Sequence, residues 1–248
     1  MTRVLVVGET WISQATHTKG FDSFASGTYH SGLEPLRAAL EARAVEVDHM
    51  PAHSAAEDFP LSLDGLAAWD VIVLSDIGAD TLLLHPDVWL RGRRVPNRLD
   101  LIHDWVVGGG GLAMAGGYLS FQGIGGKARY RGTPVEAVLP CTIDPFDDRV
   151  EAPQGVEPVV VAGDHPILTG VDGAWPALLG YNRVALRDGA TLLARVGDDP
   201  MLAVGTAGEG RTLIWTSDIG PHWCPDEFCE WTGYGQIWSQ AMRWLAGH

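Results

Sequence analysis

Short, uninterrupted apolar runs constrain the fold of this chain more than any other feature of its sequence. Val4–Val7, Val71–Leu74 and Leu112–Ala115 contain no polar side chain, which is typical of strands buried on both faces of a parallel sheet. Segments with helical spacing, Leu33–Ala42 and Arg98–Val107, lie between these runs. Such alternation favours an α/β fold, a doubly wound and mostly parallel sheet with helices on both faces.

The second half of the chain has a different pattern, with short apolar stretches separated by Gly, Pro and Asp. We expect antiparallel additions to the sheet in this C-terminal half, followed by a final strand and a closing helix over Tyr234–Leu245. The stretches are 159–161, 184–186, 192–196, 201–204 and 213–215. No repeat and no linker divides the sequence, so we expect a single domain over residues 1–248.

Residues 12–30 carry little periodicity and many Ser, Thr, Gly and His residues. This composition favours a long loop, and loops of such length inside compact domains are usually functional or disordered. Two interpretations stay open for its polar residues His17, Lys19 and Asp22. They form either a lid over the strand ends or part of a loop that packing holds in order.

The net charge and the cysteine count exclude several classes of partner and site. The chain has 31 acidic and 17 basic residues, for a formal charge of −14. Nucleic acid and anionic membranes repel such a surface, so we expect neither as a partner. Three cysteines are too few for a disulfide framework, and an odd number cannot pair completely. The cysteine count therefore favours a cytoplasmic location. No apolar run approaches the roughly 18 residues that a membrane-spanning helix needs.

Polar and aromatic residues follow the ends of the apolar runs. Doubly wound sheets bind ligands beyond the carboxyl ends of their strands. The sequence therefore predicts a site for a small-molecule ligand at this edge of the sheet. The candidate binding residues are Glu9, Trp11, His17, Lys19, Asp76, Gly117, Ser120 and Trp223.

The third apolar run enters a sharp, glycine-rich turn from Gly116 to Ser120. In a nucleophile elbow, glycines flank the reactive residue because the backbone is strained and crowded there. The N–H groups just after that residue can form an oxyanion hole. Here the reactive position holds Tyr118, which either fills the space of a nucleophile and offers its hydroxyl to a ligand, or acts as the nucleophile. Ser120 is a second nucleophile candidate or the cap of a helix start.

This turn resembles the elbow of the class I glutamine amidotransferase-like superfamily, whose usual pattern is Gly-x-Cys-x-Gly. The chain is more specifically similar to a bacterial branch of glutamine amidotransferase-like cytoplasmic proteins, which are themselves similar to trehalose-utilisation-like proteins. The resemblance implies a flavodoxin-like sheet. It does not carry over glutaminase activity, because the elbow thiolate is absent. The motifs that carry it along the chain are Lys19-Gly-Phe-Asp22, Ser75-Asp-Ile-Gly78, Pro96-Asn-Arg-Leu99, Gly116-Gly-Tyr-Leu-Ser-Phe-Gln-Gly123, Asp147-Asp-Arg149, Gly180-Tyr-Asn182 and Pro221-His-Trp223.

His222 follows the last apolar stretch, and the resemblance implies that it corresponds to the catalytic His of the superfamily. The usual His-x-Glu pattern is missing, because Cys224 stands two residues after His222. Asp218 is placed to orient the imidazole of His222, as carboxylates do in catalytic triads. The candidate catalytic residues are therefore His222, Asp218 and Tyr118.

Cys224 and the acidic residues leave further alternatives open. Cys224 is either a relocated nucleophile beside His222 or a buried, inert thiol. A zinc site of His222, Cys224 and Cys229 would have a looser spacing than usual zinc pairs. Glu9, Asp76, Asp218 and His222 would form another metal set, although carboxylates at strand ends also serve as caps and turn formers. We expect no metal and no cofactor.

Three functions follow from these patterns. The first is a small-molecule binding domain without glutaminase activity. The second is a hydrolase of a small polar or sugar-derived substrate, with His222 as its base and Asp218 as the residue that orients it. The third is an assembly module and homo-oligomer, with the tryptophan-rich C-terminal end as the self-association surface.

Overall fold

A computed structural model describes residues 1–248 of the chain. Its centre is an eight-stranded sheet in the order β4-β1-β5-β6-β14-β13-β12-β9. The first five strands in this order are parallel, and the last three are antiparallel additions. The flavodoxin-like sheet and its C-terminal antiparallel part, both predicted from the sequence, are thereby confirmed. The strands are β1 (Arg3–Gly8), β4 (Glu46–Met50), β5 (Val71–Ser75), β6 (Gly111–Ala115), β9 (Val159–Val160), β12 (Thr191–Val196), β13 (Asp199–Ala207) and β14 (Gly210–Trp215).

Helices cover both faces of this sheet, because alternate side chains of each buried strand point to opposite faces. Val4 and Val6 belong to the core on one face, together with helices α1 and α9. Leu5 and Val7 belong to the core on the other face, together with helices α2, α3, α4, α6 and α7. Each such side chain, once fully buried, stabilises the fold by about 1.5–3 kcal/mol. The helices are α1 (Glu34–Glu41), α2 (Ala52–Asp58), α3 (Leu63–Leu66), α4 (Ala79–Leu83), α5 (Pro86–Trp89), α6 (Arg98–Val107), α7 (Pro134–Val138), α8 (Asp226–Glu230) and α9 (Thr232–Leu245).

Two small sheets lie beside the main one. Strand β8 (Arg149–Val156) pairs with β10 (Leu178–Asn182), and β7 (Cys141–Thr142) pairs with β11 (Ala185–Leu186). The sequence analysis was wrong to place the stretch 184–186 in the main sheet, because it pairs with β7 in one of these small sheets. Short 3-10 helices, η1 (Ile124–Gly126) and η2 (Pro166–Leu168), complete the fold. None of the helices has the length and apolar character that crossing a membrane would require.

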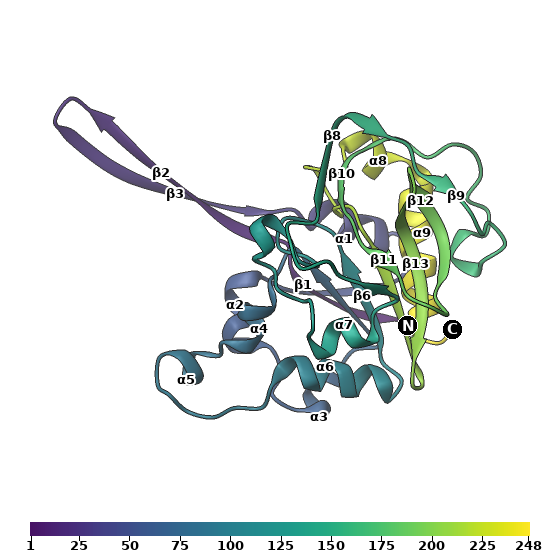
Figure 1. Ribbon diagram of the computed structural model, residues 1–248, viewed down its shortest axis with the longest axis horizontal. Helices are drawn as coiled ribbons and strands as arrows, with labels where there is room; N and C mark the ends of the chain where they lie inside the picture. The colour runs from purple at the N-terminus through teal and green to yellow at the C-terminus, as the bar shows by residue number, and fades with distance from the viewer.

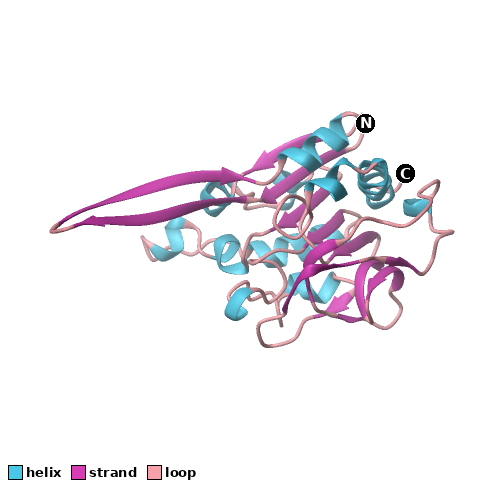
Figure 2. Ribbon diagram, turned by 90° about the horizontal axis from the view of Figure 1, so that it is seen from above, coloured by secondary structure: helices cyan, strands magenta, loops and turns pink.

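Residues 10–31, here called the arm, form a β-hairpin that projects from the body of the molecule (Figures 1 and 2). Strands β2 (Thr10–Lys19) and β3 (Asp22–Ser31) pair antiparallel in unbroken register over ten residue pairs. The two-residue turn between them is Gly20-Phe21, with a φ of +64° at Gly20. Glycine adopts this left-handed conformation without the strain that a side chain would add.

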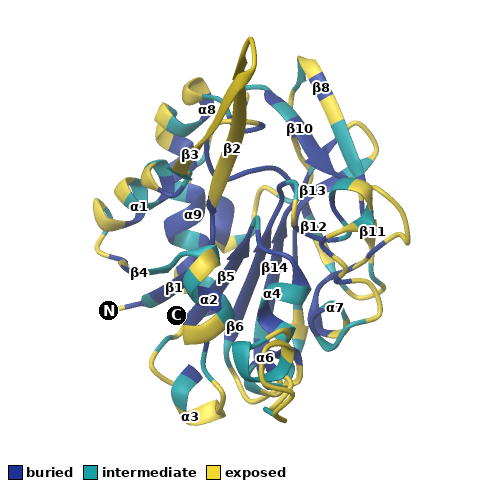
Figure 3. Ribbon diagram, turned by 90° about the vertical axis from the view of Figure 1, so that its left-hand side faces the viewer, coloured by how far each residue is buried: buried dark blue, intermediate teal, exposed yellow.

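The arm corrects the expectation of a long loop with a lid. His17, Lys19 and Asp22 lie at or within a few residues of the hairpin turn, and the turn is the end of the arm that projects away from the body of the molecule (Figure 2). Almost every side chain of the arm is exposed, as Figure 3 shows for β2 and β3. A ribbon that is exposed on both faces needs no alternation of apolar and polar residues, so the usual signal of a strand is missing.

Candidate functional site

A pocket of about 580 Å³ opens beyond the carboxyl ends of β1, β5, β6 and β14. Its volume lies within the range of small-molecule sites. The structure brings together six residues that the sequence singled out, from segments far apart in the chain. They are Glu9, Trp11, Asp76, Tyr118, Asp218 and His222, and the remaining lining residues are Leu119, Ile124, Lys127 and Pro221.

Glu9 directly follows β1 in a left-handed backbone conformation, with a φ of +54°. The hydroxyl of Ser75 donates a 2.6 Å hydrogen bond to Oε2 of Glu9. Gly32 leaves room for the carboxyl, because a Cβ at that position would overlap Oε1 of Glu9. Burial, reinforced by the negative charges of Asp218 and Asp76, raises the pKa of Glu9 to about 8. Glu9 therefore carries a proton at neutral pH and can donate a hydrogen bond as well as accept one.

Asp76 follows β5 and links that strand end to the glycine-rich turn. Its Oδ1 accepts a 2.6 Å hydrogen bond from the N–H of Leu119, and its own N–H donates to Oγ of Ser120 at 3.1 Å. Burial raises the pKa of Asp76 to about 6, although the Leu119 N–H opposes the shift. The carboxyl of Asp76 is therefore mostly ionised at neutral pH. It accepts the hydrogen bond of the first backbone N–H after Tyr118, so that N–H is not free to bind a substrate.

Ser120 does not begin a helix, contrary to one reading of the sequence. Phe121 and Gly123 both have left-handed backbone angles, with φ values of +51° and +72°. An α-helix cannot continue through such angles, and the chain instead makes turns up to η1. The buried Ser120 hydroxyl holds Asp76 in place instead.

His222 and Asp218 form the hydrogen-bonded pair that the sequence suggested. Nδ1 of His222 lies 2.8 Å from Oδ2 of Asp218, which also accepts the Trp223 N–H at 3.1 Å. This bond raises the pKa of His222 against the opposing effect of burial. Burial raises the pKa of Asp218, although its bond to His222 opposes the shift. The arrangement matches the base and its orienting carboxylate in catalytic triads, with Nε2 as the remaining ring nitrogen.

Tyr118 forms a wall of the pocket, and its hydroxyl is already engaged. That hydroxyl donates to Oε1 of Glu151 at 3.1 Å. The ring meets His222 edge-on, with centroids 4.6 Å apart, and the Arg149 guanidinium lies 4.7 Å from the ring centre. Burial and the hydrogen bond to Glu151 raise the pKa of Tyr118. The phenol therefore keeps its proton, which makes it a poor nucleophile.

Gly117 is required where two carboxyl groups approach the turn. Its φ is +143°, and its N–H donates to Oδ1 of Asn182 at 2.9 Å. A Cβ at this position would lie 2.9 Å from Oδ1 of Asp76 and 3.0 Å from Oδ1 of Asp218. Only glycine lets the two carboxyl groups converge here without displacement.

The other predicted binding residues lie at different distances from the pocket. Trp11 lines it at the base of the arm. Trp223 is buried behind it, where its indole N–H donates to Oε2 of Glu151 at 2.9 Å. His17 and Lys19 contact only other residues of the arm, so the structure does not bring them to the pocket.

The sequence analysis missed the residues that hydrogen-bond to the glycine-rich turn after β6 and pack against Tyr118. Asp148 is buried, and its carboxylate accepts two backbone N–H bonds from the turn and one from the Asn182 amide. Glu151 and Arg149 contact Tyr118 from β8. The motifs Asp147-Asp-Arg149 and Gly180-Tyr-Asn182 could have pointed to Asp148, Arg149 and Asn182, but the sequence analysis gave these motifs no role in the site.

The two neighbouring cysteines lie outside the pocket. Cys224 is buried, its Sγ is 3.6 Å from that of Cys229, and burial raises the pKa of the Cys224 thiol. No group of three or more His, Cys, Asp or Glu side chains is arranged to hold a metal ion.

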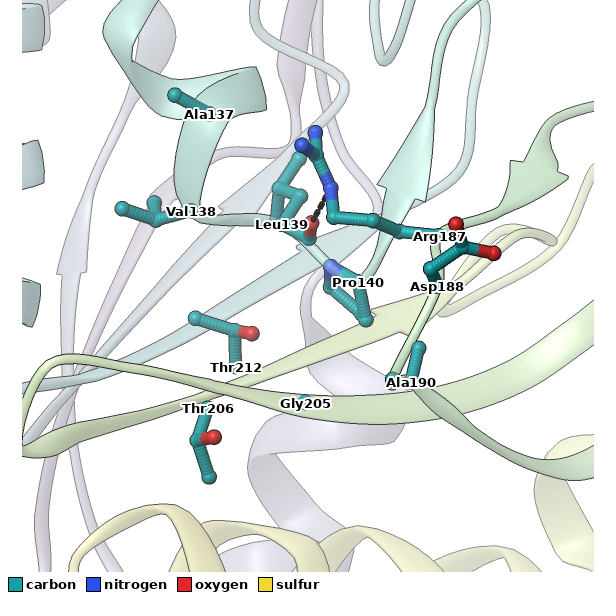
Figure 4. Close-up of a pocket in the computed structure, with 11 residues that line it drawn as sticks. Ala137, Val138, Leu139, Pro140, Arg187, Asp188, Ala190, Gly205, Thr206 and Thr212 are labelled. Carbon is teal, nitrogen blue, oxygen red and sulfur yellow. Dashed lines mark hydrogen bonds between the residues drawn. The ribbon is translucent and has the colours of Figure 1, made fainter.

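A second cavity, of about 240 Å³, lies among α7, β13 and β14 (Figure 4). Its only cationic side chain is Arg187, whose guanidinium donates to the carbonyl oxygens of Leu139, Glu136 and Cys141. Arg187 therefore holds the backbone together. We place the candidate functional site at the strand ends, where titratable groups converge.

Comparison with known proteins gives a consistent result. Two solved structures, the cytoplasmic proteins STM3548 and STM1381 of Salmonella typhimurium, are each 40% identical over 98% of this chain, with a TM-score of 0.94. They are themselves covered over 98% and 99% of their lengths. A ThuA-like protein of Parabacteroides merdae is 12% identical over 99% of this chain and 90% of its own, with a TM-score of 0.60, which shows a shared fold. Among curated proteins, the comparison finds no match.

The family model described as "Putative glutamine amidotransferase" matches residues 3–247. This match spans the parallel sheet, the elbow with Tyr118 and the pair of His222 and Asp218. The chain therefore belongs to this glutamine amidotransferase-like family.

Proposed function

We propose that this protein binds a small polar molecule in the strand-end pocket and does not hydrolyse glutamine. The observation that carries the proposal is the convergence of three carboxyl groups on one pocket, those of the buried Glu9 and Asp218 and of the half-buried Asp76. Burying such groups is costly unless hydrogen-bond partners satisfy them. A ligand rich in hydroxyl groups would supply those partners.

The rest of the pocket supports a ligand with an apolar surface between its polar groups. Trp11 and Tyr118 present aromatic rings, and Leu119 and Ile124 are aliphatic. Aromatic rings pack well against the C–H faces of sugars and similar molecules. Protonated Glu9 donates, whereas ionised Asp76 accepts, so the pocket offers both kinds of partner to a hydroxyl group.

Two features of the elbow oppose glutamine hydrolysis. The first is Tyr118 at the position of the thiolate, with its hydroxyl bonded to Glu151. The second is the N–H of Leu119, which donates to Asp76 at 2.6 Å. In an elbow this N–H would stabilise the oxyanion of the substrate. Here it is occupied, so the turn lacks both the nucleophile and one oxyanion donor.

Titration calorimetry with sugars, polyols, amino acids and glutamine tests the binding proposal. We expect saturable binding of a polyhydroxylated compound, weakened about 10-fold or more in Asp76→Asn. Asp188→Asn is the matched control, because Asp188 is an exposed carboxylate beside the second cavity. The proposal fails if no compound binds or if both variants bind alike. Ammonia release from glutamine by the wild-type protein would contradict the second half of the proposal.

A hydrolase is the second candidate, and the 2.8 Å bond between His222 and Asp218 favours it. Because the Tyr118 hydroxyl is engaged, His222 would deprotonate a water molecule that attacks the substrate directly. Protonated Glu9 would serve as the general acid, since acid and base roles separate when environments push pKa values apart. This proposal rests on the same pocket and needs no covalent intermediate.

Chromogenic amide, ester and glycoside substrates test the hydrolase proposal. We expect His222→Ala to abolish turnover while the circular dichroism spectrum and thermal unfolding stay unchanged. His103→Ala is a matched control, because His103 also pairs with a neighbouring carboxylate but lies on α6. A complete lack of turnover across the panel would exclude this candidate and leave the binding function standing.

We also propose a cytoplasmic location. The three unpaired cysteines support it, and the two similar Salmonella proteins carry the word in their names. Fractionation of cells that express the full chain would test this.

A further inference from the structure

We propose that the arm is a self-association surface, through which two copies of this chain pair along one face of their ribbons. This face, here called the aromatic face, carries two stacked ring pairs. Trp11 stacks on His30 with centroids 5.0 Å apart, and His17 stacks on Phe24 at 4.6 Å. The proposal is independent of the ligand that the pocket binds.

The arm makes few contacts with the rest of its own chain. At its base, the Ala52 N–H donates to Oγ1 of Thr10 at 2.8 Å, and the ring of Tyr29 meets that of His53 edge-on at 5.5 Å. Beyond this base the arm projects into solvent (Figures 1 and 2). An isolated two-stranded hairpin is at best marginally stable in water. A ten-pair ladder of this kind is therefore expected to gain its stability from a partner.

The exposed apolar residues of the arm are unusually large for a solvated hairpin. Its large apolar side chains are all at least two-fifths exposed: Trp11, Ile12, Phe21, Phe24 and Tyr29. By contrast, the tryptophans of the C-terminal end that the sequence suggested for assembly are mostly buried, as in Trp215, Trp223 and Trp238. The surface available for association is therefore the arm rather than the C-terminal end.

The register of the hairpin sorts these residues between its two faces. Cross-strand partners share a face, and the face alternates from one pair to the next. Tyr29 is opposite Ile12 on the face that packs against α2 at the base. Trp11 and His17 belong to the other, aromatic face. Between their ring pairs lie only small side chains, those of Ser13, Ala15, Ser26 and Thr28.

The spacing of the two ring pairs on the aromatic face allows this face to pack against the same face of a second copy. The two ring pairs are six residues apart, or about 20 Å along the strand. When two arms lie antiparallel about a two-fold axis, the inner pair of each copy faces the outer pair of the other, as an isologous interface requires. The small residues let the ribbons approach closely at the centre. The tip of each arm, with Lys19 and Phe21, then lies over the base of the other arm, beside the pocket that Trp11 lines.

Charge favours arm-to-arm contact over contact between the bodies. The chain as a whole has a formal charge of −14, whereas the arm contains one Lys and one Asp and is neutral. Two copies can thus meet through their arms without bringing acidic surfaces together.

The exposed area is sufficient for a specific dimer. The apolar aromatic side chains on this face and at the tip, those of Trp11, Phe24 and Phe21, expose about 400 Å² in one arm, given their exposed fractions and the typical area of such side chains. Burial of most of this area in both copies, with the intervening small residues, reaches the roughly 1,200 Å² of a small but stable interface.

Sedimentation velocity of the full chain and of a shortened chain tests the proposal. In the shortened chain, an Asn-Gly turn replaces residues 12–29 and joins the cross-strand partners Trp11 and His30. We expect the full chain to sediment with twice its 26.7 kDa mass at about 50 µM, and the shortened chain as a monomer. Because none of the replaced residues is buried, the body is expected to keep its circular dichroism spectrum.

A point variant and a mixing experiment sharpen the test. Phe24→Lys is expected to weaken association at least 10-fold, whereas Trp89→Lys leaves it unchanged. Trp89 is a suitable control because it is 69% exposed on α5, against 54% for Phe24. The shortened chain, when mixed with the full chain, is expected not to join its dimer. A monomeric full chain, a dimeric shortened chain or a mixed dimer would each overturn the arm-to-arm arrangement.

Discussion

Replacement of Glu9 by glutamine tests whether the pocket holds a carboxyl group in its protonated form. Burial and the charges of Asp218 and Asp76 raise the pKa of Glu9 from 4.5 to about 8. Between these two values the unfolded chain has released the Glu9 proton, whereas the folded chain retains it. The folded protein therefore loses stability as the pH rises from about 4.5 to 8. Glutamine has a similar shape but does not ionise, so Glu9→Gln removes this loss.

The size of the effect follows from the separation of the two pKa values. Each unit of pH above the unfolded pKa costs about 1.4 kcal/mol until the folded pKa is reached. Glu9→Gln should therefore raise the free energy of unfolding, relative to the wild-type protein, by at most about 3 kcal/mol at pH 7. At pH 8 or above, the upper limit is about 5 kcal/mol. At pH 4.5 or below, the two proteins should differ only by the fit of the amide against the Ser75 hydroxyl.

Urea unfolding of both proteins at several pH values between 4 and 9 measures this difference. Only the growth of the stability gain with pH is diagnostic, because a constant offset would reflect packing alone. Glu57→Gln is a matched control, since Glu57 is an exposed residue of α2. A gain that is the same at pH 5 and pH 8, or no gain at pH 8, would refute the assignment of a protonated Glu9.

Three further predictions concern other parts of the structure. Asp218→Asn removes the bond that raises the pKa of His222, so NMR titration of the imidazole should give a lower pKa in this variant; an unchanged value would contradict the pairing. Alkylation by iodoacetamide should reach Cys229 well before Cys224, because Cys224 is fully buried and burial raises its pKa; peptide mass spectrometry that finds Cys224 modified first would support a reactive thiol there. Arg98→Met leaves carbonyl oxygens at the end of α2 without their buried donors, so urea unfolding should show a loss of about 2–4 kcal/mol, and a loss under 1 kcal/mol would contradict this role.

The parallel core was predictable because its chemistry is local. Val4–Val7 and Val71–Leu74 must be buried on both faces, and Glu9 and Asp76 follow them directly in the sequence. The carboxyl ends of parallel strands meet at one edge, so the position of the pocket followed as well. The pair of Asp218 and His222 was predictable for a similar reason, since only three residues lie between them in the sequence.

The features that the sequence did not predict depend on contacts between distant segments. Strand β8 has few buried residues and therefore no apolar pattern, yet it brings Glu151 to the hydroxyl of Tyr118. The raised pKa of Glu9 arises from its burial in the folded chain, with a further contribution from Asp218 and Asp76, which only the fold brings close to it. The arm was missed because both of its faces are exposed. The turn residues Gly20-Phe21, between two stretches rich in Thr and Ser, were the available signal of a hairpin.

The hydrogen bond between the Leu119 N–H and Asp76 limits how this chain could acquire glutaminase chemistry. A Tyr118→Cys substitution would restore a thiol at the elbow but would leave this N–H bonded to the Asp76 carboxylate at the end of β5. Release of that N–H requires a second change at Asp76, which also lines the strand-end pocket. Neither change alone restores an oxyanion donor together with a nucleophile. A path to glutaminase chemistry therefore passes through a variant with an incomplete catalytic turn, and, when Asp76 changes first, with an altered strand-end pocket as well.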